Sequence, residues 1–342
     1  MIREALSKLV EGQELDLAEV EAATEEIMRG EATPAQVGAF LTALRLRGET
    51  PTEIAGFARA MRKAAIPVRP KRADLVDTCG TGGDGRGTFN ISTIAAFVVA
   101  GAGLGVAKHG NRSISSRCGS ANLVEALGVK LTLNSEQIAR CIDEVGIGFL
   151  FAPALHPAMK HATPIRRELG IRTVFNVLGP LTNPAGAKRQ LLGVYSPKLT
   201  ETLAEVLENL GSEHALVVHG ANGLDELSTT GVNKVSELSW GQIKTYYLDP
   251  QELGLPRARL ADVAGGTLEE NVRIAYEVLE GKPGPRRDIV LLNAAAALIA
   301  GGRASNFEGG LTLAAQSIDA GWALQKLEEL VRMTAALEGE DD

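Results

Sequence analysis

The chain has 342 residues, of which 45% are hydrophobic and 23% charged, and its 35 basic and 42 acidic residues leave a formal net charge of −7. This composition excludes a disordered chain, a collagen-like repeat and a coiled coil, and the negative balance argues against a broad nucleic-acid-binding surface. Glycine is in excess, at 38 of 342 residues, which is about 11% against a typical ~7%. We therefore expect a globular protein without a nucleic-acid partner.

The cysteines and the apolar segments bear on the cellular compartment. Cys79, Cys118 and Cys141 are odd in number and lack the C-x-x-C spacing of a zinc or redox site. The N-terminus has no signal-peptide pattern, and the best candidate for a membrane span, residues 91–106, is short and interrupted by glycine. These features predict a cytoplasmic protein without a membrane segment.

The first seventy residues have a helical pattern throughout. Thr33 and Thr50 are each followed by proline and, three residues on, by Gln or Glu, while Asp16 stands three residues before Glu19. Such patterns mark the first turn of a helix, because the polar side chain accepts a hydrogen bond from a free backbone N–H. The segment predicts four short helices.

From residue 75 onwards strands and helices alternate, which favours a mostly parallel sheet with helices on its faces. The expected strands are 75–78, 104–108, 190–195 and 215–219, and the helices between them 91–102, 121–127 and 199–211. Residues 235–238 and 244–248 look like an antiparallel addition, and residues 268–279 and 288–300 like covering helices. The segment 156–182 is helical but broken by prolines, a pattern that allows it to pack back onto the N-terminal helices.

A glycine-rich loop follows the first expected strand. Gly80, Gly82 and Gly85 match the dinucleotide pattern G-x-G-x-x-G. A nicotinamide enzyme, however, needs an acidic residue at the end of the next strand, where this chain has Lys108 and, three residues on, Asn111. A cation and amide donors suit an anionic group, and clustered glycines free backbone N–H groups to face it. The loop therefore predicts a phosphate-binding site.

Other polar residues allow both a structural and a functional interpretation. Asn90 and Ser92 can donate to a phosphate or simply cap the helix that starts there. Asp225 and Glu226 follow a strand and can bind Mg²⁺ or be solvated surface acids. Arg166 can pair with a substrate carboxylate or with a neighbouring acidic side chain.

Five motifs of the chain resemble the anthranilate phosphoribosyltransferase family. They are DTCGTGGD at 77–84, NIST at 90–93, KHGNRSISS at 108–116, NVLGPLTNP at 176–184 and DE at 225–226. The resemblance implies an α/β fold of the nucleoside phosphorylase/phosphoribosyltransferase-like kind. A small helical domain, residues 1–70 joined by about 157–187, would accompany a larger α/β domain with a mostly parallel central sheet, residues 71–156 and 188–342. It also implies a homodimer formed through the helical parts.

The family resemblance further implies an activity and its site. The activity is transfer of the 5-phosphoribosyl group from 5-phosphoribosyl diphosphate (PRPP) to the amine of anthranilate, in tryptophan biosynthesis, with two Mg²⁺ ions and no protein nucleophile. The implied metal positions are Ser92, Asp225 and Glu226. The implied anthranilate positions are Gly80, Asn111 and Arg166. The implied PRPP positions are Gly80, Gly83, Asp84, Thr88, Asn90, Ile91, Ser92, Thr93, Lys108, His109, Gly110, Asn111, Arg112, Ser113, Ile114, Ser115, Ser116 and Ser120.

Two other functions compete with this interpretation. A pyrimidine nucleoside phosphorylase of the same fold would share the glycine loop but carry a Lys-x-Ser-Gly-Arg-Gly-type second motif, where this chain has KHGN at 108–111. A non-catalytic nucleic-acid-binding relative would tend toward a basic surface and eroded motifs, whereas this chain is acidic and retains every motif.

Overall fold

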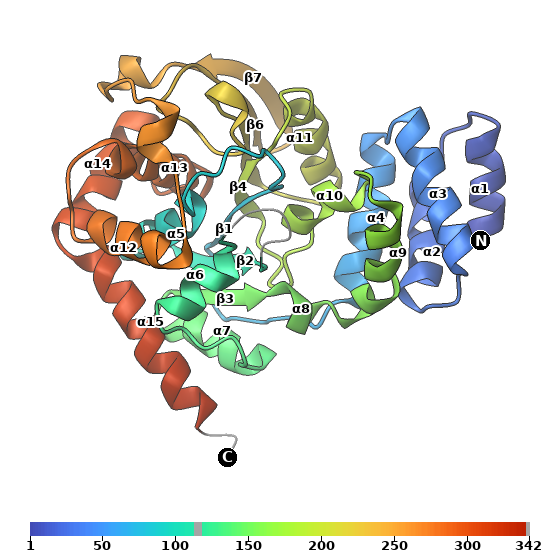
Figure 1. The fold of residues 1–342 in the computed structure, drawn as a ribbon, viewed down its shortest axis with the longest axis horizontal. Coiled ribbons are helices and arrows are strands. Elements are labelled where there is room, and N and C mark those ends of the chain that lie inside the picture. Colours follow the sequence, from blue (N-terminus) through green and yellow to red (C-terminus); the bar gives the residue numbers. More distant parts are fainter. Residues whose placement is uncertain (113–117, 340–342) are drawn as a thin grey trace.

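The computed structural model describes residues 1–112 and 118–339 and shows a helical lobe beside a larger α/β lobe (Figure 1). The N-terminal helices are α1 (Ile2–Val10), α2 (Leu17–Met28), α3 (Pro34–Arg47) and α4 (Pro51–Ala64). Asp16, Thr33 and Thr50 each accept a hydrogen bond from the backbone N–H three residues on, and the side chain of that residue returns a bond. The four predicted helices and their first-turn signals are confirmed.

A seven-stranded sheet forms the centre of the α/β lobe, in the order β3-β2-β1-β4-β5-β6-β7. Its strands are β1 (Leu75–Gly80), β2 (Gly105–Gly110), β3 (Ile147–Phe151), β4 (Arg189–Gly193), β5 (His214–His219), β6 (Asn233–Ser239) and β7 (Gln242–Leu248). The first five in this order pair in parallel, and β6 and β7 add an antiparallel edge. The mostly parallel sheet with a late antiparallel addition is confirmed.

The sequence patterns missed strand β3 and underestimated β1 and β2. β3 is a five-residue apolar run with Gly148 in its middle, and so short a run has no period that separates a strand from a buried helix. β1 and β2 each continue two residues beyond their expected ends, to Gly80 and Gly110.

Helices cover both faces of the sheet. On one face lie α5 (Ile91–Gly101), α12 (Leu268–Leu279), α13 (Pro285–Ala300), α14 (Phe307–Asp319) and α15 (Trp322–Glu338), with α6 (Ser120–Ala126) and α7 (Ser135–Glu144) in the same hydrophobic cluster. On the other face α11 (Leu199–Asn209) packs between β5, β6 and α4, so a second cluster joins the sheet to the helical lobe. No helix within the described parts of the chain has the length and apolar character needed to cross a bilayer.

The proline-broken segment returns to the helical lobe. It contains α8 (Ala152–Leu155), the 3₁₀ turn η1 (Pro157–His161), α9 (Thr163–Leu169), α10 (Phe175–Leu178) and the 3₁₀ turn η2 (Gly179–Leu181). α9 contacts α3, η1 contacts α2 and α10 contacts α4, and the ring of Phe175 packs edge-on against Phe57 at 5.9 Å between centroids. The expected packing of this segment onto the N-terminal helices is confirmed.

Candidate active site at the carboxyl edge of the sheet

The glycine loop between β1 and α5 depends on conformations that favour glycine. Gly82, Gly83, Gly85 and Gly87 all have positive φ, between +66° and +78°, where a side chain would be strained. At the end of the loop, the Gly87 carbonyl accepts a hydrogen bond from the N–H of Gly265 at 2.8 Å, which attaches the loop to the segment after β7. The loop therefore presents a backbone surface at the start of a helix, where an anion is favoured.

The acidic pair lies directly against this loop. The N–H of Gly82 donates to the Asp225 carboxylate at 2.7 Å, and the N–H of Ser92 donates to the Glu226 carboxylate at 3.2 Å. Gly80 makes the close approach possible, because a Cβ there would collide with the Asp225 carboxylate. The first of these bonds joins residues that are 143 positions apart in the sequence, and the second joins residues 134 positions apart. Distant segments thus meet at one point, as the predicted site requires.

Electrostatics of the acidic pair favours a cation. Asp225 and Glu226 are half-buried. Burial and the nearby Asp84 carboxylate raise the pKa of Asp225, and burial and Asp225 raise the pKa of Glu226, while Lys108 opposes the second effect. In the part of the chain that the structure describes, Asp84 Oδ2 is itself buried without a hydrogen-bond partner. Several crowded, incompletely paired carboxylate oxygens are the ligands a hard divalent cation prefers.

The acidic pair does not form a complete metal site by itself. In residues 1–112 and 118–339, no three His, Cys, Asp or Glu side chains gather closely enough to hold an ion. A Mg²⁺ site would have to be completed by hydroxyl, water or substrate oxygens, which is how Mg²⁺ is commonly bound beside phosphates.

Lys108, near the end of β2, extends its side chain toward the neighbouring strand β1. It is buried, and its Nζ donates to the carbonyl of Thr78 on β1. The fully buried Asp77 accepts the N–H of His109 at 3.2 Å and the amide of Asn183 at 2.8 Å. Three of the sequence motifs thereby meet around one buried carboxylate.

At the start of α5 one of the two alternatives for Asn90, capping of the helix, is not realised. Asn90 occupies the N-cap position, but its side chain does not bond to the helix; it donates to Cys118 and to the side chain of Asn271 instead. Ile91 is fully buried in the core, and its N–H donates a hydrogen bond to the Phe89 carbonyl. Thr93 is also buried, and its hydroxyl has no hydrogen-bond partner within residues 1–112 and 118–339.

The loop after β2 begins in the described region and continues outside it. Asn111 is exposed, and its backbone N–H donates to the Ser120 hydroxyl at 3.2 Å. Arg112 forms a two-point ion pair with Glu125 of α6 at 2.7 and 2.9 Å. The predicted positions Ser113, Ile114, Ser115 and Ser116 lie outside the described residues.

Two buried histidines stand at the junction of the lobes. His109 Nδ1 lies 3.1 Å from the Gly179 carbonyl, which fixes the proton on that nitrogen, and the His156 ring lies 5.2 Å away between centroids. The Nε2 atoms of both rings are buried and have no hydrogen-bond partner among the described residues. Burial lowers the pKa of His109 to about 3 and that of His156 to about 4, so both rings are neutral at physiological pH.

Arg166 on α9 carries a free cation. Its guanidinium lies over the Phe175 ring at 5.1 Å and, among the described residues, has no ion pair or hydrogen bond. The expected alternative, pairing with a neighbouring acid, is not found within residues 1–112 and 118–339. No hydrogen bond or ion pair between described residues joins Arg166 to the glycine loop, and its helix α9 packs against α3 in the helical lobe.

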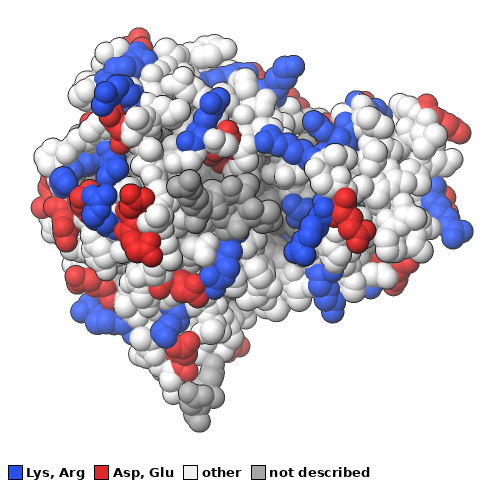
Figure 2. Space-filling model, in the orientation of Figure 1, with Lys and Arg blue, Asp and Glu red and all other residues white. Residues whose placement is uncertain are grey.

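Sequence reasoning assigned no role to Arg172, which links the segment between α9 and α10 to the glycine loop. Its guanidinium donates to the Gly83 carbonyl at 2.6 Å and stacks on the Tyr195 ring at 4.2 Å. Arg172 lies between α9 and α10 and belongs to no motif, so no local signal could have found it. Figure 2 shows Lys and Arg side chains beside the recess between the two lobes.

Comparisons with known proteins agree with this architecture. A family model described as the a/b domain of a glycosyl transferase family matches residues 72–324, and one for the helical bundle domain matches residues 3–65. An anthranilate phosphoribosyltransferase from Moorella thermoacetica is 60% identical over 97% of this chain and 98% of its own length. The crystal structure of the Thermus thermophilus enzyme is 48% identical, with a TM-score of 0.93 over 97% of this chain and 99% of that chain.

A eukaryotic relative has been solved with ligands. The anthranilate phosphoribosyltransferase of Saccharomyces cerevisiae, 32% identical over 98% of both chains, is known in complex with PRPP and Mg (TM-score 0.89) and with 4-fluoroanthranilate (TM-score 0.88).

Proposed function

Because the chain belongs to the anthranilate phosphoribosyltransferase family, we infer that it transfers the 5-phosphoribosyl group of PRPP to the amine of anthranilate. The products are N-(5-phosphoribosyl)anthranilate and diphosphate, in tryptophan biosynthesis. One observation carries the inference in this chain: the glycine loop, the start of α5 and the acidic pair are hydrogen-bonded to one another beside Lys108. The comparisons favour this activity over a nucleoside phosphorylase and over a nucleic-acid-binding relative.

PRPP would occupy the glycine loop and the ends of β1 and β2. Positive-φ glycines, a helix N-terminus and a buried lysine suit its phosphates. Ile91 would contribute only through its position at the helix start, since its side chain lies in the core. The described residues proposed to line this subsite are Gly80, Gly83, Asp84, Thr88, Asn90, Ile91, Ser92, Thr93, Lys108, His109, Gly110, Asn111, Arg112 and Ser120.

Mg²⁺ would be held by Ser92, Asp225 and Glu226. The crowded carboxylates and the unpartnered Asp84 oxygen fit such a cation. When bound, Mg²⁺ would neutralise the charge that develops on the departing diphosphate. We propose two ions, as the family resemblance implies.

Anthranilate would bind on the helical side of the site. Its carboxylate matches the free guanidinium of Arg166, and Gly80 and Asn111 complete the proposed contacts. The neutral, buried rings of His109 and His156 suit the aromatic ring of anthranilate better than an anionic group. The amine would then face the ribose carbon from the side opposite the diphosphate.

The protein would act by holding its substrates in line. Departure of diphosphate from C1 of the ribose leaves an oxocarbenium-like carbon that the amine can attack directly, so no protein nucleophile is required. The cysteines are poor nucleophiles, because burial raises the pKa of Cys79 and that of Cys118. We propose that the enzyme works in the cytoplasm as a homodimer.

The direct test is an assay of anthranilate fluorescence. We expect the signal to fall only when protein, PRPP and Mg²⁺ are all present, and to persist when any one is omitted. Phosphorolysis of thymidine or uridine, with anthranilate left intact, would instead identify a nucleoside phosphorylase.

A further inference from the structure

The segment that follows the acidic pair is held by a fully buried asparagine of α13. The N–H of Leu227, the residue after Glu226, donates to Asn293 Oδ1 at 2.9 Å, and the carbonyl of Leu227 accepts from Asn293 Nδ2 at 2.8 Å. The same Nδ2 donates to the Ile289 carbonyl one turn earlier at 2.8 Å. Asn293 is 0% exposed and is the one polar side chain in the run from Ile289 to Ala300.

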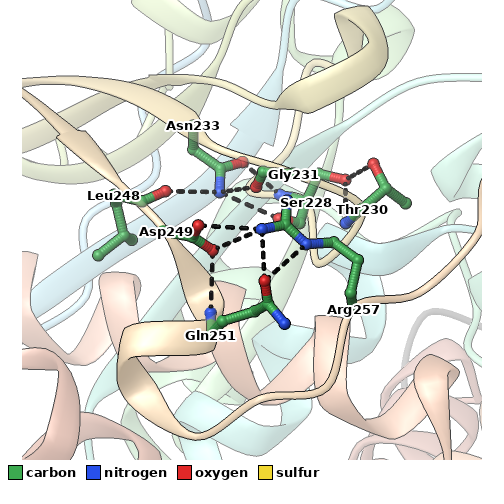
Figure 3. Close-up of polar contacts among 8 residues, drawn as sticks. All are labelled: Ser228, Thr230, Gly231, Asn233, Leu248, Asp249, Gln251 and Arg257. Atoms are coloured by element: carbon green, nitrogen blue, oxygen red, sulfur yellow. Dashed lines mark hydrogen bonds and ion pairs between the residues drawn. The ribbon is translucent and has the colours of Figure 1, made fainter.

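A second buried asparagine holds the next residue in the same way. The N–H of Ser228 donates to Asn233 Oδ1 at 2.7 Å, and the carbonyl of Ser228 accepts from Asn233 Nδ2 at 3.0 Å (Figure 3). Nδ2 of Asn233 also lies within 3.3 Å of the Gly231 and Leu248 carbonyls. Arg257, paired with Asp249 at 2.9 Å, braces the chain just beyond Leu248 (Figure 3).

This arrangement fixes the backbone in both position and direction. A carboxamide side chain carries an acceptor oxygen and a donor nitrogen in one rigid plane. When it bonds to both the N–H and the C=O of one residue, it takes the place of the paired residue on a neighbouring β-strand. Repeating it on two successive residues leaves the chain immediately after Glu226 little freedom. Before the pair, a Cβ at Gly193 would collide with the Asp225 carbonyl, so the acidic pair is seated tightly on that side as well.

The acidic pair needs such restraint because its neighbouring carboxylates repel each other. Two like charges in a half-buried position would separate if the backbone could yield. A backbone anchored on both sides instead keeps both carboxylates directed at the glycine loop and the start of α5. There the N–H groups of Gly82 and Ser92 donate hydrogen bonds to them.

We propose that Asn293 and Asn233 are positioning residues for the metal-binding carboxylates Asp225 and Glu226, acting through the backbone of Leu227 and Ser228. The proposal rests on the metal role assigned to the acidic pair under the proposed function. All the hydrogen bonds that the structure gives the two amide side chains go to backbone groups of the chain, and neither asparagine is among the residues proposed to bind substrate or metal. Their loss should therefore weaken the use of Mg²⁺ and PRPP while leaving anthranilate binding intact.

The test compares Asn293→Ala and the milder Asn293→Ser with a matched control. Ser317→Ala removes another fully buried hydrogen bond, from the Ser317 hydroxyl to the Val98 carbonyl at 2.8 Å, and lies outside the site. Three quantities are measured: the Mg²⁺ concentration for half-maximal rate, the Kd of Mg²⁺-PRPP by calorimetry without anthranilate, and the KM for anthranilate.

For the Asn293 variants we expect the half-maximal Mg²⁺ concentration and the Kd of Mg²⁺-PRPP to rise about ten-fold, the low end of the loss typical of groups that orient metal ligands. The KM for anthranilate should change less than about two-fold. Ser317→Ala should lower the Tm alone. Asn233→Ser should repeat the Asn293 pattern and serves as the second variant should the alanine variant not fold.

The outcomes separate this proposal from the proposed function. If wild-type turnover needs Mg²⁺ and Asp225→Asn with Glu226→Gln weakens this Mg²⁺-dependent turnover, but the asparagine variants resemble Ser317→Ala, the positioning role is overturned alone. If wild-type turnover does not depend on Mg²⁺, the metal role of the acidic pair fails and the positioning role fails with it.

Discussion

At the scale of single residues, Arg166 is the clearest test of the acceptor site. Its guanidinium has no partner among the described residues and lies only over the Phe175 ring. A charged hydrogen bond to the anthranilate carboxylate contributes about 1.5–3 kcal/mol, so Arg166→Ala should raise the KM for anthranilate roughly ten- to hundred-fold. The KM for PRPP should change far less. The exposed neighbour Arg167→Ala is the control, and an equal rise in both KM values would remove Arg166 from the acceptor site.

Gly193, at the end of β4, is a position where the absence of a side chain matters. A Cβ there would meet the backbone of Asp225, two residues before the segment that the two asparagines hold. We expect Gly193→Ala to cost roughly 1–3 kcal/mol of unfolding free energy and to raise the Mg²⁺ requirement. Gly38→Ala in α3, whose nearest neighbour would be Leu169 Cδ2 at 3.8 Å, should be neutral or stabilising by up to about 1 kcal/mol. Urea titration of both variants measures the difference, and equal stabilities would contradict the close approach at Gly193.

His156 predicts a pH dependence of stability. Its pKa is lowered by burial from 6.5 to about 4, so below pH 6.5 the unfolded chain binds a proton that the folded chain does not. The stabilisation from the neutral ring is therefore complete above about pH 6.5 and is lost as the pH falls toward 4, by up to about 1.4 kcal/mol per pH unit. Asp225 and Glu226, with raised pKa values, act in the opposite direction, so the measurement must be a difference between proteins.

We therefore compare wild type with His156→Gln by urea unfolding between pH 7.5 and 5. The variant should be less stable at pH 7.5, and this deficit should shrink as the pH falls, because only the wild type loses the contribution of the neutral ring. A deficit that stays constant across the range would show that His156 titrates in the folded protein as it does in the unfolded chain.

At the scale of elements, Arg172 connects the α9–α10 segment to the glycine loop. The loop contains four positive-φ glycines, which leave its backbone more conformational freedom in the absence of contacts, and the bond from Arg172 to the Gly83 carbonyl restrains it. Arg172→Ala should free the loop and raise the KM for PRPP by about ten-fold, the equivalent of ~1.4 kcal/mol. The KM for anthranilate should move less, and Arg167→Ala on the same segment should change neither. A PRPP KM equal to that of wild type would show that the loop needs no support from the helical side.

Prediction from sequence was best where the signal is local. The Thr-Pro helix starts at Thr33 and Thr50 need only the next three residues, and each forms as expected. Strand β3 was missed because its short apolar run has no distinguishing period. The capping alternative for Asn90 could not be ruled out from sequence for another reason: its side chain bonds to Cys118 and Asn271, and Asn271 lies 181 residues away in sequence.

At the scale of the whole molecule, the site depends on contacts between distant segments. Motifs identified Asp225 and Ser92 as candidates, but their meeting at one point follows from the sheet order, which places β5 and β1 on either side of β4. Arg172 and Asn233 carried no motif and could not be found from sequence. Asn293 did leave a signal, as a lone amide in an apolar helix. The predicted domain boundaries at 70, 157 and 187 stay a prediction, because one hydrophobic cluster runs from the helical lobe into the sheet.

The proposed homodimer gives the last prediction, at the outer end of the helical lobe. Val10 of α1 and Leu46 of α3 are apolar yet 75% and 83% exposed, and the two helices pack against each other. Contact with a second copy would bury both side chains, at a gain of roughly 1.5–3 kcal/mol for each. A charge there would be costly to bury without a partner.

We therefore expect light scattering to give a mass near twice 36.0 kDa for the wild type, and Leu46→Asp to shift it toward the monomer. Trp240→Ser, which removes another apolar side chain that is 72% exposed but lies on the β6–β7 turn, should leave the mass unchanged. A dimer that survives Leu46→Asp but dissociates in Trp240→Ser would move the interface to the sheet edge. Because Arg166 lies on α9, which packs against α3, dissociation at Leu46 should also raise the KM for anthranilate more than that for PRPP.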